Sequence, residues 1–267
     1  MIGGRTRVFA LLGDPVSHSL SPAMQNAAFR VLGIDAVYVP LPCPPEQVGA
    51  LMRSLASAGG GGNVTVPHKE VAASVLDRAS DRVAELGTCN TFWWDEDCLR
   101  GDTTDVDGIL AAVDRLGVDA DAWLVIGTGG SARAVAEAAH QRGARLAVAS
   151  RDPARRTAFA ARAAALGVAS AAPEEAGLVI NATPLGLRPN DPLPLPLAAT
   201  PAARAALDMV YRPGCTPWVR AHRLAGRPAD DGREVLVAQG AAALARWFPL
   251  HVPPVEVMRA VVRAALG

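Results

Sequence analysis

Short apolar runs, closed by glycine, proline or small polar residues, alternate along this chain with segments in which apolar residues recur at helical spacing. Such runs are typical of buried strands, and the recurring spacing is typical of amphipathic helices. In the first part of the chain the pattern predicts strands Val8–Leu12, Ala36–Leu41 and Asn63–Val66, with helices Pro22–Leu32 and Glu46–Ser57 between them. This alternation favours an α/β layer with parallel strands.

Capping residues set the expected boundaries of these elements. Ser21 is predicted to be an N-cap, with Pro22 at the first helical position and Gly33 at the end of the helix. The run Gly59–Gly62 is expected to lead into the third strand, and Pro67 to stop it. Further elements are expected at Lys69–Leu76 and Ser80–Leu86 as helices and at Asn90–Trp94 as a strand.

A second region of alternating elements begins with an amphipathic helix at Val106–Leu116, and we place a domain boundary at its start. The expected strands are Trp123–Ile126, Leu146–Ala149, Leu178–Ile180 and Leu207–Val210. The expected helices are one ending at Arg142, then Ala154–Leu166, Glu234–Trp247 and Val255–Leu266, and the proline-rich stretch Leu187–Pro201 is expected to be a loop. The sequence therefore predicts two α/β regions.

Composition narrows the class of protein. Half of the 267 residues are hydrophobic and the formal net charge is zero. The composition therefore does not indicate a nucleic acid or an acidic surface as a binding partner. No apolar run is long enough to cross a bilayer. The four cysteines show no Cys-x-x-Cys spacing and predict reduced thiols: Cys43, Cys89, Cys98 and Cys215. We expect a cytoplasmic protein, without membrane or metal.

A glycine-rich turn, Gly127-x-Gly129-Gly130, follows an apolar strand and precedes a helix. Glycines let the backbone approach a pyrophosphate, and the free N–H groups at the helix start bind it. The context predicts a dinucleotide site, although a tight turn without a ligand has the same pattern. The next strand ends at Ser150-Arg151 rather than at an acid, and arginine suits the 2′-phosphate of NADP. The alternative is that these arginines are merely solvent-exposed residues at a helix start. The negative charge of Asp152 opposes a preference for NADP.

Lys69 is the only lysine in the chain and lies where a strand gives way to a helix. Lysine can exchange a proton with a substrate, whereas arginine stays protonated, so a single lysine among many arginines is a candidate acid–base group. Chance retention in an arginine-rich chain is the alternative. Small polar residues at other strand ends predict a polar substrate cleft: Ser19, Ser21, Asn63, Thr65, Asn90, Thr104, Asp105 and Gln239.

Eight motifs occur in order along the chain: Gly13-Asp14-Pro15-x-x-His18-Ser19-x-Ser21-Pro22, Asn63-Val64-Thr65-Val66-Pro67-His68-Lys69, Gly87-x-x-Asn90-Thr91, Thr104-Asp105-x-x-Gly108, Gly127-x-Gly129-Gly130-Ser131-Ala132-Arg133, Asn181-Ala182-Thr183-Pro184-Leu185-Gly186, Asp208-x-Val210-Tyr211-x-Pro213 and Val237-Ala238-Gln239. With these motifs the whole chain resembles the shikimate dehydrogenase family, whose members reduce 3-dehydroshikimate with NADPH.

The resemblance implies an α/β fold of two domains with a cleft between them. Residues 1–105, completed by the closing helices in 236–267, would form the substrate-binding domain, and residues 106–235 a Rossmann-type NADP-binding domain. Lys69 and Asp105 would be the catalytic pair. The implied substrate ligands are Ser19, Ser21, Thr65, Asn90, Tyr211 and Gln239. The implied cofactor ligands are Gly127, Gly129, Gly130, Ser131, Ala132, Ser150, Arg151, Arg155, Thr183 and Met209.

The chain departs from the family pattern at four places. Gln25 stands where a histidine is usual, Thr103 replaces an asparagine, and Ser150-Arg151-Asp152 replaces Asn-Arg-Thr. Gly232-Arg233-Glu234-Val235 replaces a Gly-x-Gly-Met segment that lies near the nicotinamide in the family. From the resemblance as a whole we expect NADP-dependent reduction of 3-dehydroshikimate by a monomer or homodimer. A quinate or aminoshikimate dehydrogenase using NAD or NADP, and a non-catalytic dinucleotide-binding module, are the alternatives.

Overall fold

The structure is a computed structural model that describes residues 2–267, and the chain divides into two compact units. Unit 1 comprises the residues up to Asp105 together with Leu236–Ala265. Unit 2 comprises Val106–Val235 and the last two residues. Each unit contains one β-sheet with helices packed against it, so the predicted α/β class is confirmed.

Unit 1 is built on a sheet with strand order β2-β1-β3-β5-β6-β4. The strands are β1 (Arg7–Gly13), β2 (Ala36–Pro42), β3 (Gly61–Val64), β4 (Arg78–Ala79), β5 (Thr91–Asp95) and β6 (Cys98–Asp102). Strands β2, β1 and β3 are parallel, as predicted, whereas β5 is antiparallel to both β3 and β6. The sheet is therefore mixed, because the strand expected at Asn90–Trp94 pairs with its neighbours in the antiparallel direction.

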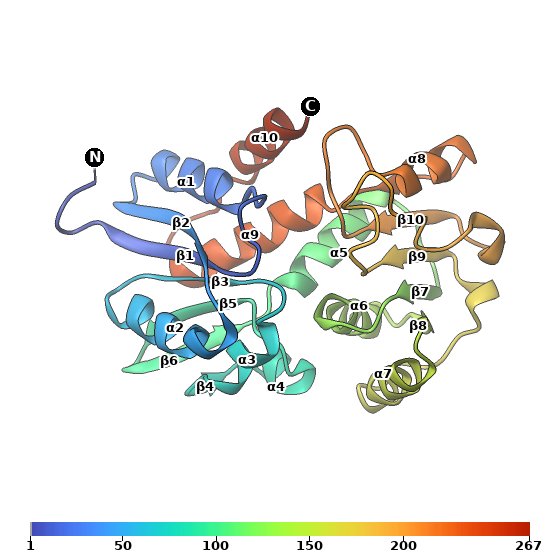
Figure 1. Cartoon of the computed structure of the whole chain (residues 1–267), viewed down its shortest axis with the longest axis horizontal. Helices are drawn as coiled ribbons and strands as arrows, with labels where there is room; N and C mark the ends of the chain where they lie inside the picture. The colour runs from blue at the N-terminus through green and yellow to red at the C-terminus, as the bar shows by residue number, and fades with distance from the viewer. Residues whose placement is uncertain (1) are drawn as a thin grey trace. The chain divides into compact units, whose positions relative to one another are not determined.

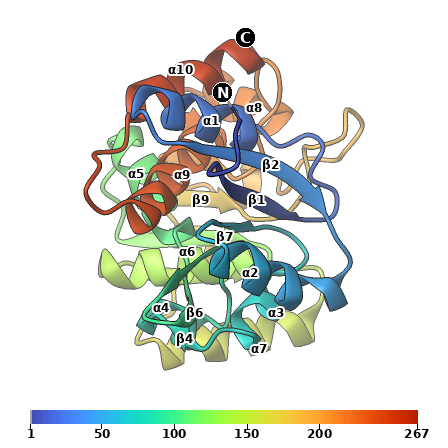
Figure 2. The same cartoon turned by 90° about the vertical axis from the view of Figure 1, so that its left-hand side faces the viewer.

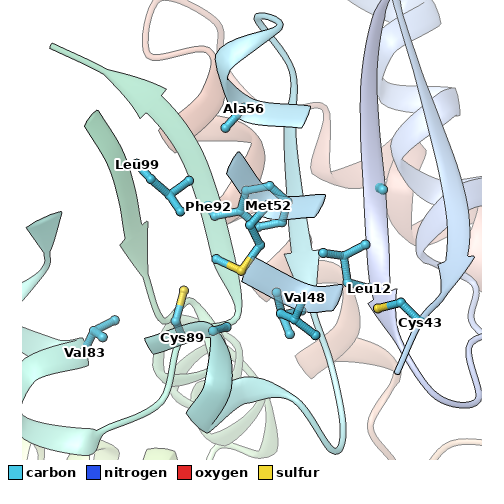
Figure 3. Close-up of a cluster of buried hydrophobic side chains, with 12 residues drawn as sticks. Leu12, Cys43, Val48, Met52, Ala56, Val83, Cys89, Phe92 and Leu99 are labelled. Atoms are coloured by element: carbon cyan, nitrogen blue, oxygen red, sulfur yellow. The ribbon is translucent and has the colours of Figure 1, made fainter. Parts of the chain in front are cut away.

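Helices cover both faces of this sheet. The helices of unit 1 are α1 (Ser21–Val31), α2 (Val48–Ser57) after a 3-10 turn (Pro45–Gln47), α3 (Lys69–Ser74), α4 (Asp81–Leu86), α9 (Arg233–Trp247, which begins in unit 2) and α10 (Val255–Leu266). Figures 1 and 2 show α1 and α2 on opposite sides of β1. Val48, Met52 and Ala56 recur every fourth residue on α2, and they face Phe92 and Leu12 in a fully buried cluster (Figure 3). This spacing places one face of α2 against the sheet.

The third strand begins two residues earlier than the sequence pattern indicated, because glycines form it. A Cβ on Gly62 would lie 2.1 Å from the carbonyl oxygen of Ala10, and one on Gly61 would lie 2.6 Å from that of Phe92. Only glycine lets the neighbouring backbones approach so closely. The strand ends at Val64, and the N–H of His68 donates to Thr65 O at 2.9 Å in the turn that follows.

Strands β4 and β6 were missed. A two-residue turn joins β5 to β6, with Glu96 and Asp97 both at positive φ. Such turns are usually marked by Asn-Gly or Asp-Gly, so Glu-Asp gives no hairpin signal. Strand β6 also ends in Gly101-Asp102, residues of low strand propensity.

Unit 2 has a fully parallel sheet with strand order β11-β10-β9-β7-β8. Its strands are β7 (Ala122–Ile126), β8 (Arg145–Ala149), β9 (Leu178–Asn181), β10 (Ala205–Asp208) and β11 (Ala229–Asp230). Its helices are α5 (Asp105–Leu116, whose first residue belongs to unit 1), α6 (Gly130–Gln141), α7 (Pro153–Ala165) and α8 (Pro217–Leu224), and 3-10 turns lie at Pro173–Glu175 and Leu197–Ala199. Figure 1 shows α6 and α7 beside β7 and β8.

Three details of unit 2 differ from the sequence-based expectation, and the first is the short strand β11, which was missed. Strand β10 ends at Asp208, not at Val210, because the Asp208 carboxylate accepts the Val210 N–H at 3.1 Å and closes a turn. Helix α8 was missed, although Thr216 caps it and Pro217 occupies its first turn. None of the helices within residues 2–267 has the length and apolar character that crossing a bilayer requires.

Candidate active site

The ends of several strands meet at one edge of the sheet in unit 1. In the strand register Asn63 lies opposite Thr91, and Thr91 lies opposite Asp102. Strands β3 and β6 therefore end where the antiparallel β5 begins. The same edge of the sheet therefore holds the residues that follow Val64 and Asp102 and the residue that precedes Thr91. This topology explains why short polar residues that are distant in sequence come together here.

Lys69 and Asp105 form an ion pair at this edge. Each is the first residue of a helix, Lys69 of α3 and Asp105 of α5, and their side chains are only 13% and 10% exposed. The backbone around Lys69 is held on two sides. The ring of the buried His68 contacts Cys43 O through Nε2 at 2.8 Å, and the N–H of Cys89 donates to Lys69 O at 2.9 Å. The side chain of Lys69 therefore extends from a backbone whose position is fixed by these two contacts.

Asn90 connects this pair to its surroundings. Its Nδ2 donates to Asp105 Oδ1 at 2.9 Å, and its Oδ1 accepts the N–H of Thr104 at 2.8 Å and the hydroxyl of Thr91 at 2.9 Å. Gln239 Oε1 lies 3.5 Å from the same Nδ2. The structure therefore brings together four residues that the sequence pointed to: Lys69, Asp105, Asn90 and Gln239.

Gln239 is carried by α9, and two contacts at later residues of the helix attach it to the rest of unit 1. Gln25, which is fully buried on α1, donates to Gly240 O at 2.9 Å. Arg246 Nε donates to Asp102 Oδ2 at 3.0 Å. Burial alone would raise the pKa of Asp102, but the hydrogen bond from Ser80 and the charge of Arg246 hold it below its usual value. Gln25, one of the four departures from the family pattern, therefore helps to hold α9 in place.

The two serines form a separate pair at the start of α1. The N–H of Ser21 donates to Ser19 Oγ at 3.2 Å. Leu20, not Ser21, is the N-cap residue of α1, and no side chain caps the helix. The predicted capping role of Ser21 was therefore wrong, and its buried hydroxyl is not committed to the helix end. Thr65 lies in the turn after β3, where its N–H donates to Leu12 O at 2.8 Å.

In unit 2 the glycine-rich turn follows β7 at the point where strand order reverses. Gly127 has φ of +111°, and a Cβ there would lie 3.0 Å from the Ala182 carbonyl oxygen. A Cβ on Gly129 would meet nothing within 4 Å. Gly129 is the N-cap of α6, no side chain caps this helix, and its first turn, which includes Ser131 and Ala132, contains no acid. Open space in front of uncapped N–H groups suits a pyrophosphate.

The end of β8 lies beside this turn, because the N–H of Gly127 donates to Ala149 O at 2.9 Å. Arg151 and Arg155 follow with exposed side chains. Asp152 Oδ1 accepts the N–H groups of Ala154 and Arg155 at 2.9 and 3.1 Å. Asp152 is thus the N-cap of α7. The end of β8 suits the 2′-phosphate of NADP.

Thr183 and Met209 follow β9 and β10 at the same edge of this sheet. The Thr183 hydroxyl donates to Asn181 Oδ1 at 2.7 Å, and Asn181 Nδ2 donates to Asp208 Oδ1 at 2.8 Å. The N–H of Met209 donates to Asn181 O at 2.9 Å. Burial raises the pKa of Asp208 to about 6. A buried network therefore fixes both candidate cofactor ligands.

The departure at Gly232-Arg233 has a structural explanation within unit 2. A Cβ on Gly232 would lie 2.3 Å from Met209 O, so the backbones touch there. Arg233 Nη2 donates to the carbonyl oxygens of Arg212 and Gly214 at 3.0 and 2.6 Å. Arg233 therefore ties the start of α9 to the loop after β10, which also carries Tyr211. Tyr211 belongs to a different unit from the two serines.

Three residues surround Asn90. Asn63 and Thr104 were expected only as members of a polar cleft, and Thr91 was given no role beyond its place in a motif. Thr91 and Asn63 are paired across β5 and β3, and their side chains hydrogen bond at 2.9 Å. Their signal was present in the motifs Asn63-Val64-Thr65 and Asn90-Thr91. The strand pairing that joins these motifs is not visible in the sequence. Within residues 2–267, no group of three histidine, cysteine, aspartate or glutamate residues is arranged to hold a metal ion.

Taken together, the two α/β units, a dinucleotide-type turn in one and a lysine–aspartate pair in the other define the class as a nicotinamide-dependent oxidoreductase. Comparisons with known proteins agree. Residues 11–92 match the model of the shikimate dehydrogenase substrate binding domain, and residues 232–263 match that of the shikimate 5′-dehydrogenase C-terminal domain.

The similarity to known proteins extends over nearly the whole chain. Shikimate dehydrogenase (NADP(+)) from Rubrobacter xylanophilus is 41% identical, and the match covers 97% of this chain and 96% of that protein. The corresponding protein from Acidiphilium cryptum is 36% identical over the full length of both. The structure of shikimate 5-dehydrogenase from Thermus thermophilus in complex with NADP(H) and shikimate has a TM-score of 0.86 and 36% identity, covering 97% of this chain and 100% of that one. This chain belongs to the shikimate dehydrogenase family.

Proposed function

We propose that this chain catalyses the reversible, NADP-dependent reduction of 3-dehydroshikimate to shikimate. The observation that carries the proposal is the buried pair of Lys69 and Asp105 in a chain that is similar over its whole length to NADP-dependent shikimate dehydrogenases. Unit 1 would bind the substrate and unit 2 the cofactor. The nicotinamide, when bound, supplies or accepts the hydride.

Lys69 would transfer the proton. In the reducing direction its ammonium donates a proton to the alkoxide that forms at the substrate carbonyl, and in the oxidising direction its neutral amine takes the proton back. Asp105 holds Lys69 in place through Oδ2 and is itself held by Asn90 through Oδ1. Both carboxylate oxygens are therefore occupied, so the ammonium is oriented before the substrate arrives.

The substrate would be held by hydrogen bonds from residues of unit 1 and from Tyr211. The hydroxyls of Ser19 and Ser21 suit the carboxylate, because neither caps α1. Thr65, Asn90 and Gln239 would bind the ring hydroxyls. A ring acid with several hydroxyls matches this set of donors and acceptors, since a site built to pair hydroxyls discriminates against analogues that lack them.

The cofactor would be bound by the turn Gly127–Ala132 and by Ser150, Arg151, Arg155, Thr183 and Met209. The N–H groups at the start of α6 suit the pyrophosphate, and the two arginines suit the 2′-phosphate. Asp152 is engaged as the N-cap of α7, so its charge is partly compensated by two N–H groups. We therefore expect NADP to be preferred over NAD.

The experiment that tests this function follows the absorbance of reduced nicotinamide while the purified chain is mixed with shikimate and NADP⁺. The same assay with quinate, and with NAD⁺ in place of NADP⁺, supplies the comparison. We expect the highest kcat/KM for shikimate with NADP⁺. An absence of turnover with every pair would exclude a dehydrogenase of this class, and a higher kcat/KM for quinate would reassign the substrate.

A further inference from the structure

A line of buried side chains leads from β2 to the Lys69–Asp105 pair. Tyr38 Oη donates to Asn63 Oδ1 at 2.8 Å, and Asn63 Nδ2 donates to Thr91 Oγ1 at 2.9 Å. Thr91 Oγ1 donates to Asn90 Oδ1 at 2.9 Å, and Asn90 Nδ2 donates to Asp105 Oδ1 at 2.9 Å. The first four side chains are at most 4% exposed. Four hydrogen bonds thus connect three strands to the carboxylate that holds Lys69.

The direction of every bond in this line is fixed by chemistry. Burial raises the pKa of Tyr38, so the phenol keeps its proton and donates it. Asn63 Nδ2 also donates to Asn90 O at 3.0 Å, and a carbonyl oxygen only accepts. The Thr91 hydroxyl accepts from Asn63 and donates its single proton to Asn90 Oδ1 at 2.9 Å, which is nearer than the Thr104 hydroxyl at 3.3 Å. At the other end the Asp105 carboxylate only accepts.

We propose that Thr91, oriented by Asn63 and Tyr38, is a positioning residue of the reaction. Its hydroxyl holds the Asn90 amide with Oδ1 toward the sheet and Nδ2 toward Asp105. A rotated amide would place its oxygen against the carboxylate, where the two acceptors repel. The inference rests on the proposed function only in assigning the chemistry to Lys69 and Asp105. The hydrogen-bonded line exists whatever the substrate.

Asn90 Oδ1 has other donors, and they define what Thr91 adds. The N–H and the hydroxyl of Thr104 also point to this oxygen, at 2.8 and 3.2 Å. Thr104 immediately precedes Asp105 and shares its backbone, so it moves with the carboxylate. Thr91 begins β5 and is anchored in the sheet. The bond from Thr91 is therefore the one that ties the side-chain oxygen of Asn90 to the sheet rather than to Asp105's own segment.

The test compares Thr91→Val, which removes the hydroxyl while keeping the shape, with Thr91→Ser, which keeps the hydroxyl. We expect Thr91→Val to lower kcat about tenfold, because two buried groups lose a partner. KM for NADP should stay within about twofold, and Thr91→Ser should restore kcat to within about threefold of the wild type. Thr103→Val is the matched control, since the buried Thr103 hydroxyl has no hydrogen-bond partner in residues 2–267. It should leave kcat unchanged.

A second readout does not depend on turnover. Lys69 is the only lysine of the chain, so protein labelled with ¹³C-lysine gives a single set of side-chain NMR signals that reports on this ion pair. Thr91→Val should shift the Lys69 Cε–Hε signal, and Thr91→Ser and Thr103→Val should not. Tyr38→Phe, at the far end of the line, should shift it in the same direction by less. This variant replaces Thr91→Val if the latter fails to fold.

Three outcomes would overturn the positioning role. A folded Thr91→Val variant with the wild-type kcat and Lys69 signal would reduce Thr91 to a structural residue. Equal losses of kcat in Thr91→Val and Thr91→Ser would assign the effect to packing. If Thr91→Val does not fold, an unchanged Lys69 signal in Tyr38→Phe would also contradict the proposal. Failure of the proposed function would give a different result. The wild type would be inactive with shikimate, but the Lys69 signal would still differ between the wild type and the Thr91→Val variant.

Discussion

The side-chain amide of Asn90 donates to the Asp105 oxygen that Lys69 does not hold, at 2.9 Å. One carboxylate thus receives a charged donor on one oxygen and a neutral donor on the other. All three side chains are largely buried, so water cannot replace either partner at low cost. The orientation of Lys69 is consequently set by two residues rather than by one.

Asp105→Asn should lower kcat by about 10²-fold, in the range that acid–base groups contribute. An amide has one oxygen, so either Lys69 or Asn90 would face an NH₂ group instead of an acceptor. Asp114→Asn is the matched control on the same helix, because Asp114 is exposed and pairs with Arg142 at the surface. Initial rates with saturating shikimate and NADP⁺ measure the effect. A kcat equal to that of Asp114→Asn would remove Asp105 from the mechanism.

Ser21→Ala should raise KM for shikimate about tenfold without changing Tm, because a hydrogen bond to a charged carboxylate contributes about 1.5–3 kcal/mol. The structure gives Ser21 no capping role, so helix α1 should not weaken. Ser80→Ala is the contrasting variant, since Ser80 caps α4 and also donates to Asp102. It should lower the free energy of unfolding by about 1 kcal/mol. The opposite pattern, with Ser21→Ala losing stability and keeping KM, would return Ser21 to a structural role.

Arg151→Ala should raise KM for NADP⁺ and leave KM for NAD⁺ nearly unchanged. The guanidinium offers charge-assisted donors to a 2′-phosphate that NAD⁺ lacks. Arg156→Ala, at an exposed arginine within α7, is the control for loss of positive charge. Asp152→Asn should sharpen the preference for NADP⁺, because an asparagine keeps the N-cap while removing the negative charge. Equal efficiency of the wild type with NAD⁺ would contradict the account of this strand end.

His222→Leu should change how stability depends on pH. Burial, followed by the charge of Arg227, lowers the pKa of His222 from 6.5 to about 4, and neither ring nitrogen has a hydrogen-bond partner in residues 2–267. The unfolded chain therefore takes up the proton first as the pH falls through 6.5, which destabilises the fold. Asp208 acts in the opposite sense. Its raised pKa adds stability that is complete below the ordinary value of 3.8 and is lost as the pH rises through about 6.

The variant isolates the histidine contribution from that of Asp208. Between pH 7 and pH 5 the free energy of unfolding of His222→Leu should rise relative to the wild type by about 1–2 kcal/mol. Denaturant titrations at the two pH values measure this difference. Any effect of the substitution on packing changes the free energy of unfolding equally at both pH values and therefore cancels. Parallel curves for the two proteins would show that His222 is not held neutral in the folded state.

Much of the fold was predictable because its elements carry local signals. The strand ending at Ile126 and the helix ending at Gln141 are bounded by glycines, and α10 matches its predicted limits. The errors arose where tertiary contacts decide. Gly61 and Gly62 form a strand because backbone packing excludes a side chain, and Glu96-Asp97 forms a hairpin turn without the residues that usually mark one.

The candidate site was predictable to a similar depth and for a similar reason. Motifs identified Lys69, Asp105, Asn90 and Gln239, which the structure places in one hydrogen-bonded group. Thr91 gained its meaning only from the pairing of β5 with β3, which depends on residues far apart in the chain. Ser21 was wrongly predicted to be an N-cap and the N-cap role of Asp152 was missed, because a short polar residue before a helix has the same sequence pattern whether or not its side chain points back.

The acid–base role of Lys69 is tested by kcat of Lys69→Ala in the oxidation of shikimate by NADP⁺, with circular dichroism to verify the fold and titration to verify cofactor binding. Loss of the single proton-transfer group should lower kcat by about 10²–10⁴-fold while NADP⁺ still binds. Lys69→Arg should be similarly impaired, because arginine keeps the charge but does not release its proton. A folded Lys69→Ala variant that retains more than about a tenth of the wild-type kcat, well above the range expected for an acid–base group, would contradict the account.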